Sequence, residues 1–529
     1  MSTKSLTQTA IHTLCLLALC IFPVHELQSQ TWQEYDEDDS YVARHEFSFV
    51  QAGDKFVYFG GRESAQTVEV YDFTTDTWST GGMAPYEFNH CQGVLYEGLI
   101  WVIGAFKDND TEENADYVYM YNPVTESWIE GMPIPEARKR GANGLVMKND
   151  KFYMVGGNTN GHYGGYVSYF DEYDPVNGTW TILDDAPNAR DHIQTVVYNN
   201  KIYALGGRLS GGPGGIFSPM IPESDVYDFT TESWTTLGSS SDIPTPRAGY
   251  GVALFNNEIF VIGGEGMHPD GYNTQWNTVE AFDPATNLWE TKASLNNSRH
   301  GIQAIVSGNG IIVISGSSGG TSFKSMEYYN EYNPSGTALI NSTFEADELV
   351  KNFAYPSDAI NFSINIELSN NTGDTGTYID NISLSGDNFA LETSYDNRFV
   401  KSNTSLNVQV NLLDPNVTES NGTVTITYNN SSQIVVTLNG ILDDTLSTIK
   451  VENLSELSLY PNPTSSSFQL NKDINSLTIY NLSGKKVKEF KNLSSTGTSF
   501  DVSELASGLY FLQAMDTQGA IAKGKLVKN

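Results

Sequence analysis

Short apolar runs recur between residues 31 and 336, and each one ends in a glycine pair or a close variant of it. The clearest copy is residues 202–205, which precede Gly206-Gly207. The other pairs stand at 60–61, 156–157 and 263–264, with degenerate versions at 104–105 and 316–317. A unit of about 50 residues is too short to bury a core alone, so the copies must stack on one another. The pattern therefore predicts six stacked β units.

Aromatic residues follow each glycine pair at a constant spacing. In five copies Trp comes seven positions after Tyr or Phe, at Tyr71 and Trp78, Tyr121 and Trp128, Tyr173 and Trp180, Tyr227 and Trp234, and Phe282 and Trp289. Several copies place Asp-Pro or Asn-Pro between the two rings, which is type I turn chemistry. Each aromatic pair is thus predicted to lie on one hairpin, where the rings fill the wedge between neighbouring units. The sixth copy reaches Tyr332-Asn333-Pro334 and then has no Trp.

These glycine, tyrosine and tryptophan motifs resemble the kelch family of β-propellers, and the resemblance covers residues 31–336. It implies six blades of four strands around a central channel. Trp32 precedes the first glycine pair by about half a repeat. We expect the strand that carries Trp32 to complete the sixth blade, because this closure leaves no exposed sheet edge.

The amino terminus has the pattern of an export signal. Residues 1–30 contain Lys4, an apolar run and then polar residues before the first propeller strand. The run is too short, and too interrupted by Pro23 and His25, to span a bilayer as a helix. We expect a cleaved secretory signal and no transmembrane segment.

A second domain is predicted at residues 337–446, where apolar and polar residues alternate, as in 360–366 and 405–412. Alternation of this kind indicates half-buried strands, and the spacing suits an immunoglobulin-like β-sandwich. Residues 379–389 resemble the Hydin-type immunoglobulin-like module, which implies a spacer. Residues 447–454 are polar and acidic, and we expect a linker there.

The last domain, residues 455–529, carries ordered motifs: Leu-Tyr-Pro-Asn-Pro-Thr at 459–464, Leu-Thr-Ile-Tyr-Asn-Leu-Ser-Gly-Lys at 477–485, and a Lys-bearing end. They resemble the C-terminal sorting domain of the type IX (Por) secretion system of Bacteroidetes, which implies this machinery as a partner. The resemblance also implies passage across the outer membrane, followed by release or attachment to the cell surface. In this segment eight Lys face six Asp or Glu, which sets it apart from a chain of net charge −34. So acidic a chain is not expected to bind nucleic acid, whose phosphates require clusters of Lys and Arg.

Candidate ligand-binding residues lie on the propeller. In five copies an arginine stands before the glycine pair, and in the second copy Phe88 takes its place. The spacing to the pair is sixteen positions in each copy except the sixth, where it is one residue longer. These arginines are Arg44, Arg140, Arg190, Arg247 and Arg299. By repeat geometry we expect them at one mouth of the channel, where guanidinium groups could hold a carboxylate. Alternatively, arginines at a repeated position tie one blade to the next through backbone carbonyls.

Further candidates lie beside these arginines. His45, His192 and His300 each follow one of them closely, and Trp276 belongs to a long Gly-rich loop on the same face. Together they predict a binding site for carbohydrate or a protein partner, with no cofactor and no metal. We expect this all-β chain of three domains to be a secreted or surface-attached binding protein.

Two enzyme alternatives stay open. With His90 at the matching place in the second copy, four imidazoles near one axis could ligate a metal. Copper-radical oxidases of the galactose oxidase kind use a kelch propeller, but the adjacent Tyr-His ligand pair of that family is missing here. A sialic-acid mutarotase is also a six-bladed kelch protein and would use an Arg, Glu and His cluster on a sugar acid. The sequence contains no motif specific to it.

Overall fold

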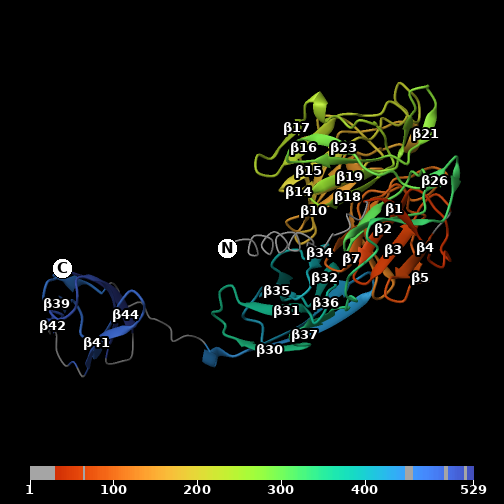
Figure 1. Cartoon of the computed structure of the whole chain (residues 1–529). Coiled ribbons are helices and arrows are strands. Elements are labelled where there is room, and N and C mark those ends of the chain that lie inside the picture. The colour runs from red at the N-terminus through yellow and green to blue at the C-terminus, as the bar shows by residue number, and fades with distance from the viewer. Residues whose placement is uncertain (1–29, 64–65, 447–456, 492, 494–498, 517–520) are drawn as a thin grey trace, which may run out of the picture.

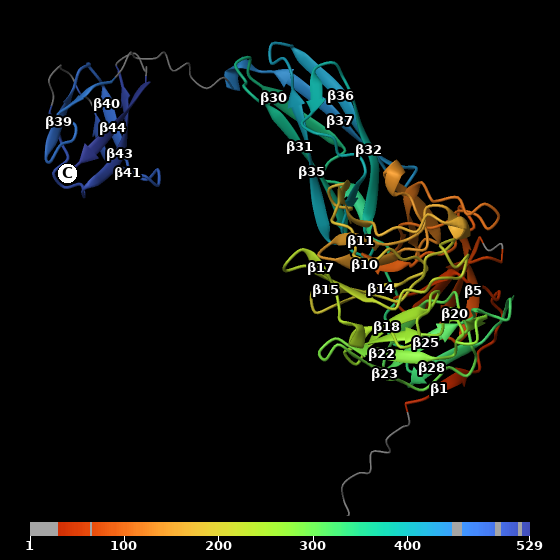
Figure 2. The ribbon, with the colours of Figure 1, turned by 90° about the horizontal axis from the view of Figure 1, so that it is seen from above.

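The computed structural model describes residues 30–63, 66–446, 457–491, 493, 499–516 and 521–529. These residues form strands β1 to β44 with four short 3-10 turns, which are η1 (Glu136–Arg138), η2 (Gly161–Tyr163), η3 (Ser239–Ser241) and η4 (Asp444–Leu446). The predicted signal, apart from residue 30, and the predicted linker at 447–454 lie outside the described residues. Figures 1 and 2 show the propeller, a sandwich packed against it and a third β unit that stands apart from both.

Six four-stranded antiparallel sheets form the blades of the propeller, confirming the predicted fold class. Blade 1 contains β2 (Phe47–Ala52), β3 (Lys55–Gly60), β4 (Thr67–Asp72) and β5 (Thr77–Met83), and blade 2 contains β6 (Val94–Tyr96), β7 (Leu99–Val102), β8 (Tyr117–Asn122) and β9 (Ser127–Pro133). Blade 3 contains β10 (Gly144–Lys148), β11 (Lys151–Val155), β12 (Phe170–Asp174) and β13 (Thr179–Ile182), and blade 4 contains β14 (Thr195–Tyr198), β15 (Lys201–Leu205), β16 (Ser224–Asp228) and β17 (Ser233–Thr236). Blade 5 contains β18 (Gly251–Phe255), β19 (Glu258–Ile262), β22 (Val279–Asp283) and β23 (Leu288–Thr291), and blade 6 contains β24 (Ala304–Ser307), β25 (Gly310–Ile314), β28 (Met326–Asn330) and β1 (Trp32–Tyr35). Two small hairpins, β20–β21 (Glu265–Met267, Asn273–Gln275) and β26–β27 (Ser317–Ser318, Thr321–Ser322), project from the last two blades.

The repeated aromatic residues are direct cross-strand partners. Tyr71 pairs with Trp78, and the other four pairs share this register. Each pair also brings the two rings to within 4.8–5.4 Å of each other, centroid to centroid. The predicted hairpins are therefore confirmed.

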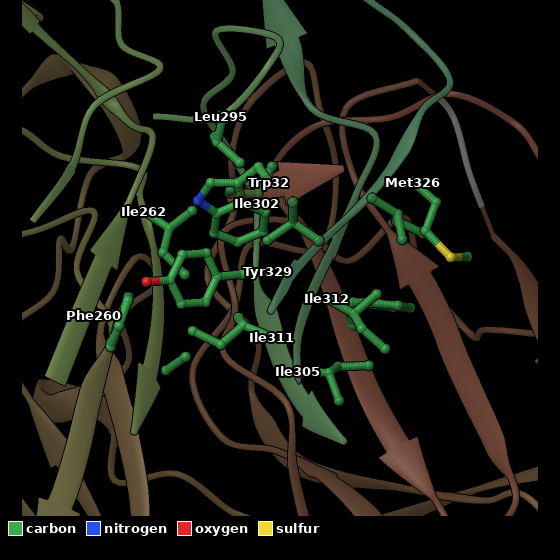
Figure 3. Close-up of a cluster of buried hydrophobic side chains, with 14 of the residues drawn as sticks. Trp32, Phe260, Ile262, Leu295, Ile302, Ile305, Ile311, Ile312, Met326 and Tyr329 are labelled. Atoms are coloured by element: carbon green, nitrogen blue, oxygen red, sulfur yellow. The ribbon is translucent and has the colours of Figure 1, made fainter. Parts of the chain in front are cut away.

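The sixth blade is closed by the amino-terminal strand, as the sequence predicted. In β1 the partner of Trp32 is Tyr329 of β28, and only 5% of the Trp32 surface is exposed. Figure 3 shows Trp32 and Tyr329 together among aliphatic side chains of blades 5 and 6, including Ile302. The aromatic residue of the sixth copy is thus Tyr329. Tyr332, named from the sequence, lies beyond β28 and stacks on Tyr35 instead.

A two-sheet sandwich follows the propeller. One sheet contains β29 (Thr343–Ala346), β31 (Ser363–Asn371), β35 (Thr404–Leu412) and β33 (Phe389–Leu391), and the other contains β30 (Val350–Tyr355), β37 (Ser432–Leu442), β36 (Glu419–Tyr428), β32 (Thr377–Ser385) and β34 (Arg398–Val400). Its inward-facing residues form one buried apolar cluster. The resemblance to a Hydin-type module stays a prediction.

The sandwich packs on the face of the propeller that carries the hairpin turns. Phe399 is 2% exposed, and its ring lies 5.0 Å from that of Trp101. Its backbone N–H donates to the carbonyl of Pro175, in the β12–β13 turn. Lys401 pairs with Asp150, in the β10–β11 turn. The loops that join second to third strands emerge at the other ends of these strands, so the opposite face of blades 2 and 3 is left uncovered by these contacts.

The C-terminal unit is a smaller sandwich. Its sheets contain β38 (Leu459–Tyr460), β39 (Ser467–Leu470) and β42 (Ser499–Asp501), and β41 (Lys486–Lys491), β40 (Ser476–Tyr480), β43 (Gly508–Met515) and β44 (Ile521–Lys528). Asn462 of the Pro-Asn-Pro motif fastens β44, because its amide donates to the carbonyl of Lys525 and its oxygen accepts from the N–H of Val527. Among the described residues, we find no helix with the length and apolar character needed to cross a bilayer.

Candidate functional site at the propeller mouth

The five predicted arginines lie inside the blades and not in the channel mouth. Each side chain is fully buried and forms an ion pair with a carboxylate on the third strand of its own blade. The pairs are Arg44 with Glu69, Arg140 with Asp171, Arg190 with Asp225, Arg247 with Glu280 and Arg299 with Glu327. The expectation that these arginines reach a ligand at the mouth is corrected by this geometry. They brace the blades.

Main-chain contacts of the same residues join neighbouring blades. The Arg190 guanidinium donates to the carbonyl of Gly206 in its own blade (2.7 Å), whereas the Arg190 carbonyl accepts from the N–H of Gly157 in the preceding blade (2.9 Å). The alternative prediction, a structural role for these arginines, is therefore confirmed. The link between blades, however, is made by the backbone of the arginine and not by its side chain.

The sixth blade follows the same rule in a shifted register. Arg299 donates to the carbonyl of Ser315, sixteen residues later, as the other arginines do to the first glycine of a pair. The left-handed φ angles of Ser315 and Gly316, 48° and 100°, match those of Gly60 and Gly61, 77° and 103°. The sixth glycine pair is thus Ser315-Gly316, and no extra residue is needed.

The residues two positions after the five arginines, and after Phe88 in the second blade, line the channel. We call them the channel ring. These six residues adopt positive φ angles of 52–67° and are Glu46, His90, Ala142, His192, Gly249 and Gly301. Main-chain hydrogen bonds join five of the six neighbouring pairs around the axis, as from the N–H of His90 to the carbonyl of Glu46 (3.0 Å). Outside glycine, this conformation costs roughly 1–2 kcal/mol. The channel ring thus holds a carboxylate and two imidazoles in strained backbone positions, which is typical of functional sites.

Three imidazoles meet at the bottom of the mouth. One ligand nitrogen from each of His90, His162 and His192 lies within 4.8 Å of the other two. Each Nδ1 is already engaged, with Asn89 Oδ1 (2.5 Å), Glu112 Oε1 (2.6 Å) and Asp191 Oδ1 (2.5 Å), respectively. An Nδ1–H that donates to these oxygens leaves the lone pair on Nε2. In its neutral form, each of the three side chains therefore keeps one acceptor nitrogen, Nε2.

Charged groups surround this triad. Glu112 accepts from the N–H of His162 (2.8 Å) and is paired with Arg62, and Glu265 is paired with Arg208. Burial raises the pKa of Glu112, but hydrogen bonds from His162 and Arg62 outweigh it and lower that pKa to about 2. For Glu265 burial is likewise outweighed, by His300 and Arg208, and its pKa is also lowered to about 2. Both carboxylates are therefore ionised at neutral pH.

The imidazoles of the channel ring are held neutral. Burial lowers the pKa of His90 well below its usual value, and the neighbouring His192 and His162 lower it further. Burial and then Arg208 lower the pKa of His192. A neutral imidazole is the form that can act as a metal ligand or as a hydrogen-bond acceptor.

The other predicted histidines lie across the mouth. The ring centroids of His45 and His300 are 5.4 Å apart. His45 Nδ1 contacts Glu63 Oε1 at 2.6 Å, and His300 Nε2 lies 3.7 Å from Glu265 Oε2. Burial lowers the pKa of His45, but its hydrogen bond to Glu63 prevails and the pKa is raised. Trp276, in contrast, does not line the mouth; it stacks beside His268 with ring centroids 6.0 Å apart.

A cavity of about 410 Å³ opens above these groups. Its lining includes His45, Glu46, Glu112, His162 and His300, and at its rim lie Tyr163 and Phe217. Tyr163 is 76% exposed and Phe217 39%. Below the histidine triad the channel narrows to a cavity of about 30 Å³, which is room for a water or a small ion. The mouth is therefore a cup with a polar floor and aromatic groups at its edge.

The sequence contained a signal for the buried role of the arginines. Each of the five arginines is matched by Asp or Glu two positions before the repeated aromatic residue, and the copy with Phe88 has Tyr119 there. In the structure the rings of Phe88 and Tyr119 are in contact, with centroids 4.9 Å apart. The triad itself left a weaker signal, because His162 belongs to a loop whose path the repeat does not determine.

Comparisons with known proteins agree with this architecture. The family model of the KLHDC2/KLHL20/DRC7 Kelch-repeats domain matches residues 144–333, and that of the secretion system C-terminal sorting domain matches residues 458–529. Kelch-like protein terF of Aspergillus terreus is 32% identical over 289 residues, which are 52% of this chain and 61% of that protein. Kelch-like protein 23 of Homo sapiens is 26% identical over 237 residues, 44% of this chain and 38% of that protein.

A solved structure titled "Structure of YjhT" also matches, with a TM-score of 0.47 and 16% identity over 55% of this chain and 95% of that one. The chain spans less than two thirds of the length of terF and of Kelch-like protein 23. The sheet topology and the two family models thus lead to one conclusion. This chain contains a kelch-repeat β-propeller and, at its carboxyl end, a secretion-system C-terminal sorting domain.

Proposed function

We propose that this protein is an exported binding protein whose propeller mouth recognises a carbohydrate. The observation that carries the proposal is the mouth cavity of about 410 Å³, with exposed Tyr163 and Phe217 at its rim and buried polar groups on its floor. Cavities of about 300–1,000 Å³ with a few convergent polar groups are typical of small-ligand sites. Sugars suit such a cup, since the aromatic rings can cover an apolar sugar face while carboxylates and imidazoles bind the hydroxyls.

The arrangement of the domains favours this face. The sandwich occupies the hairpin-turn face through Phe399 and Lys401 and leaves the mouth open. The sorting domain indicates export and a secreted or surface location. A protein at the cell surface that presents a free mouth is placed to meet glycans or neighbouring proteins.

A glycan array probed with the full chain tests the proposal. Tyr163→Ala and Phe217→Ala are expected to weaken binding at least about tenfold, because each removes a ring from the rim. Tyr460→Ala is the matched control, since Tyr460 is 79% exposed but lies in the C-terminal unit. Binding that is lost equally in the control, or that survives both rim changes, would contradict the proposal. An array without any bound glycan would favour a protein partner.

The sugar-acid mutarotase alternative gains one specific observation. Arg62, Glu112 and His162 form a hydrogen-bonded group on the wall of the cavity, which is the set of residue types that this activity would need. Accelerated exchange between the two anomers of sialic acid, followed by NMR, would support it. Exchange at the uncatalysed rate would leave the binding function.

A further inference from the structure

We infer that His90, His162 and His192 form a binding site for one divalent transition-metal ion of the zinc class. The inference replaces the sequence-based expectation of no metal, and it does not depend on which ligand the mouth recognises. It starts from the three ligand nitrogens that lie within 4.8 Å of one another. Neutral imidazole is a preferred ligand of Zn²⁺, Cu²⁺, Ni²⁺ and iron.

Unpaired buried nitrogens are the second observation. His90 Nε2 and His192 Nε2 have no hydrogen-bond partner among the residues that the structure describes. Both residues are only 5% exposed. A buried polar atom left without a partner destabilises the folded state. A cation placed between the three ligand nitrogens can engage a lone pair of each imidazole.

The surroundings of each histidine fit metal ligation as well. Metal-binding histidines usually donate their other ring nitrogen to a carboxylate or a carbonyl, which fixes the tautomer and the orientation of the ring. Here Asp191 and Glu112 supply carboxylates and Asn89 supplies a carbonyl oxygen. The rings are therefore held in place by contacts that do not use Nε2.

The charge around the triad favours a dication. Four carboxylates, of Glu46, Glu112, Asp191 and Glu265, surround it together with two guanidinium groups, of Arg62 and Arg208. Four negative and two positive charges leave a formal surplus of two negative charges when the imidazoles are neutral.

The geometry leaves a coordination position open. Zinc bonds to nitrogen of about 2.0–2.1 Å in a tetrahedron place neighbouring ligand atoms about 3.4 Å apart. The distances between the three nitrogens, up to 4.8 Å, would have to shorten by up to about 1.4 Å to reach this spacing, which rotation of the side chains can supply. A tetrahedral ion then has one position left. Two groups are available for it: the Glu46 carboxylate, whose Oε2 lies 3.7 Å from His90 Nε2, and an oxygen donor in the mouth cavity.

Zinc binding by the full chain, prepared without a polyhistidine tag and stripped with a chelator, tests this inference. We expect one Zn²⁺ per chain by calorimetry and by elemental analysis, and one Co²⁺ with the intense visible absorption of a four-coordinate ion. His162→Ala should weaken Zn²⁺ binding more than about 100-fold, since it removes a ligand, and Glu112→Gln about 10–100-fold, since it releases the ring that it orients.

His268→Ala is the matched control, because His268 lies in a loop of the same face but stacks on Tyr272 away from the triad. Thermal unfolding in chelator checks that each variant is folded, and the Co²⁺ spectrum of the unaltered chain does not depend on any variant. Absence of stoichiometric metal in the unaltered chain, or equal affinities of the His162→Ala and His268→Ala proteins, would overturn the inference. Because no glycan is present, failure here leaves the proposed binding function standing.

Discussion

The arginine positions and the channel ring lie two residues apart in every blade, yet their composition differs. The first set is nearly uniform, and its guanidinium groups are buried against a carboxylate of the same blade. The second set contains glycine twice, alanine once, histidine twice and glutamate once, although all six share a left-handed backbone. Uniform positions hold the frame, where every blade has the same task. The varied positions face a single axis, and there each blade can contribute a different group.

The largest expected effect comes from breaking the frame. Arg190→Ala should lower the free energy of unfolding by about 3–5 kcal/mol, because it leaves the fully buried Asp225 carboxylate without its partner. Denaturant unfolding measures this change. Arg398→Ala, which removes a half-buried arginine of the sandwich, is the control and should cost less than about 1 kcal/mol. Equal costs for the two variants would mean that the arginine layer does not brace the propeller.

The next largest change in stability is expected at the hairpin-turn face, where the sandwich packs on the propeller. Phe399→Ala should lower the free energy of unfolding by about 3 kcal/mol, since it removes a ring packed between Trp101 and Tyr96. Small-angle X-ray scattering should show the sandwich moving relative to the propeller. Glycan binding should not change, because the mouth lies on the other face. A loss of binding in this variant would contradict the separation of the two faces.

A smaller effect is expected from relieving backbone strain in the channel ring. Glu46→Gly should leave the free energy of unfolding unchanged or raise it by about 1 kcal/mol, because glycine accepts the left-handed conformation freely. Binding at the mouth should weaken. The reverse type of change, Gly301→Ala, should destabilise the protein, as a Cβ there would lie 2.6 Å from the Glu46 nitrogen. Thermal unfolding of both variants makes the comparison.

The smallest expected effect is a pH dependence of the free energy of unfolding, caused by Asp380 of the sandwich. Burial raises the pKa of Asp380 to about 6, and the hydrogen bond from the Asn430 N–H (2.8 Å) opposes this only in part. A carboxyl whose pKa is raised on folding stabilises the native state below its unfolded pKa of about 3.9, and this contribution is lost as pH rises through about 6. Asp380→Asn should reduce the change in the free energy of unfolding between pH 4 and pH 6. Because the group is half exposed, we expect less than about 1 kcal/mol. A curve unchanged by the substitution would assign the dependence to another group.

Repetition made the fold predictable, and its absence concealed the site. The glycine pairs and the Tyr-Trp spacing indicated six blades, and the place of Trp32 indicated the closure, because each feature recurs under the same packing constraint. The arginines recur too, and that recurrence was itself a sign of a structural role. The histidine triad joins two channel positions to His162, which comes from a loop of blade 3. Only the three-dimensional path of that loop brings the third imidazole to the other two.

Anomalous diffraction from crystals soaked in Zn²⁺ tests most directly whether the varied positions of the channel form the site. We predict a single strong peak in the channel, about 2.0–2.1 Å from the Nε2 atoms of His90, His162 and His192. A map without a peak there, or with the imidazoles bonded to protein donors in place of a metal, would contradict it.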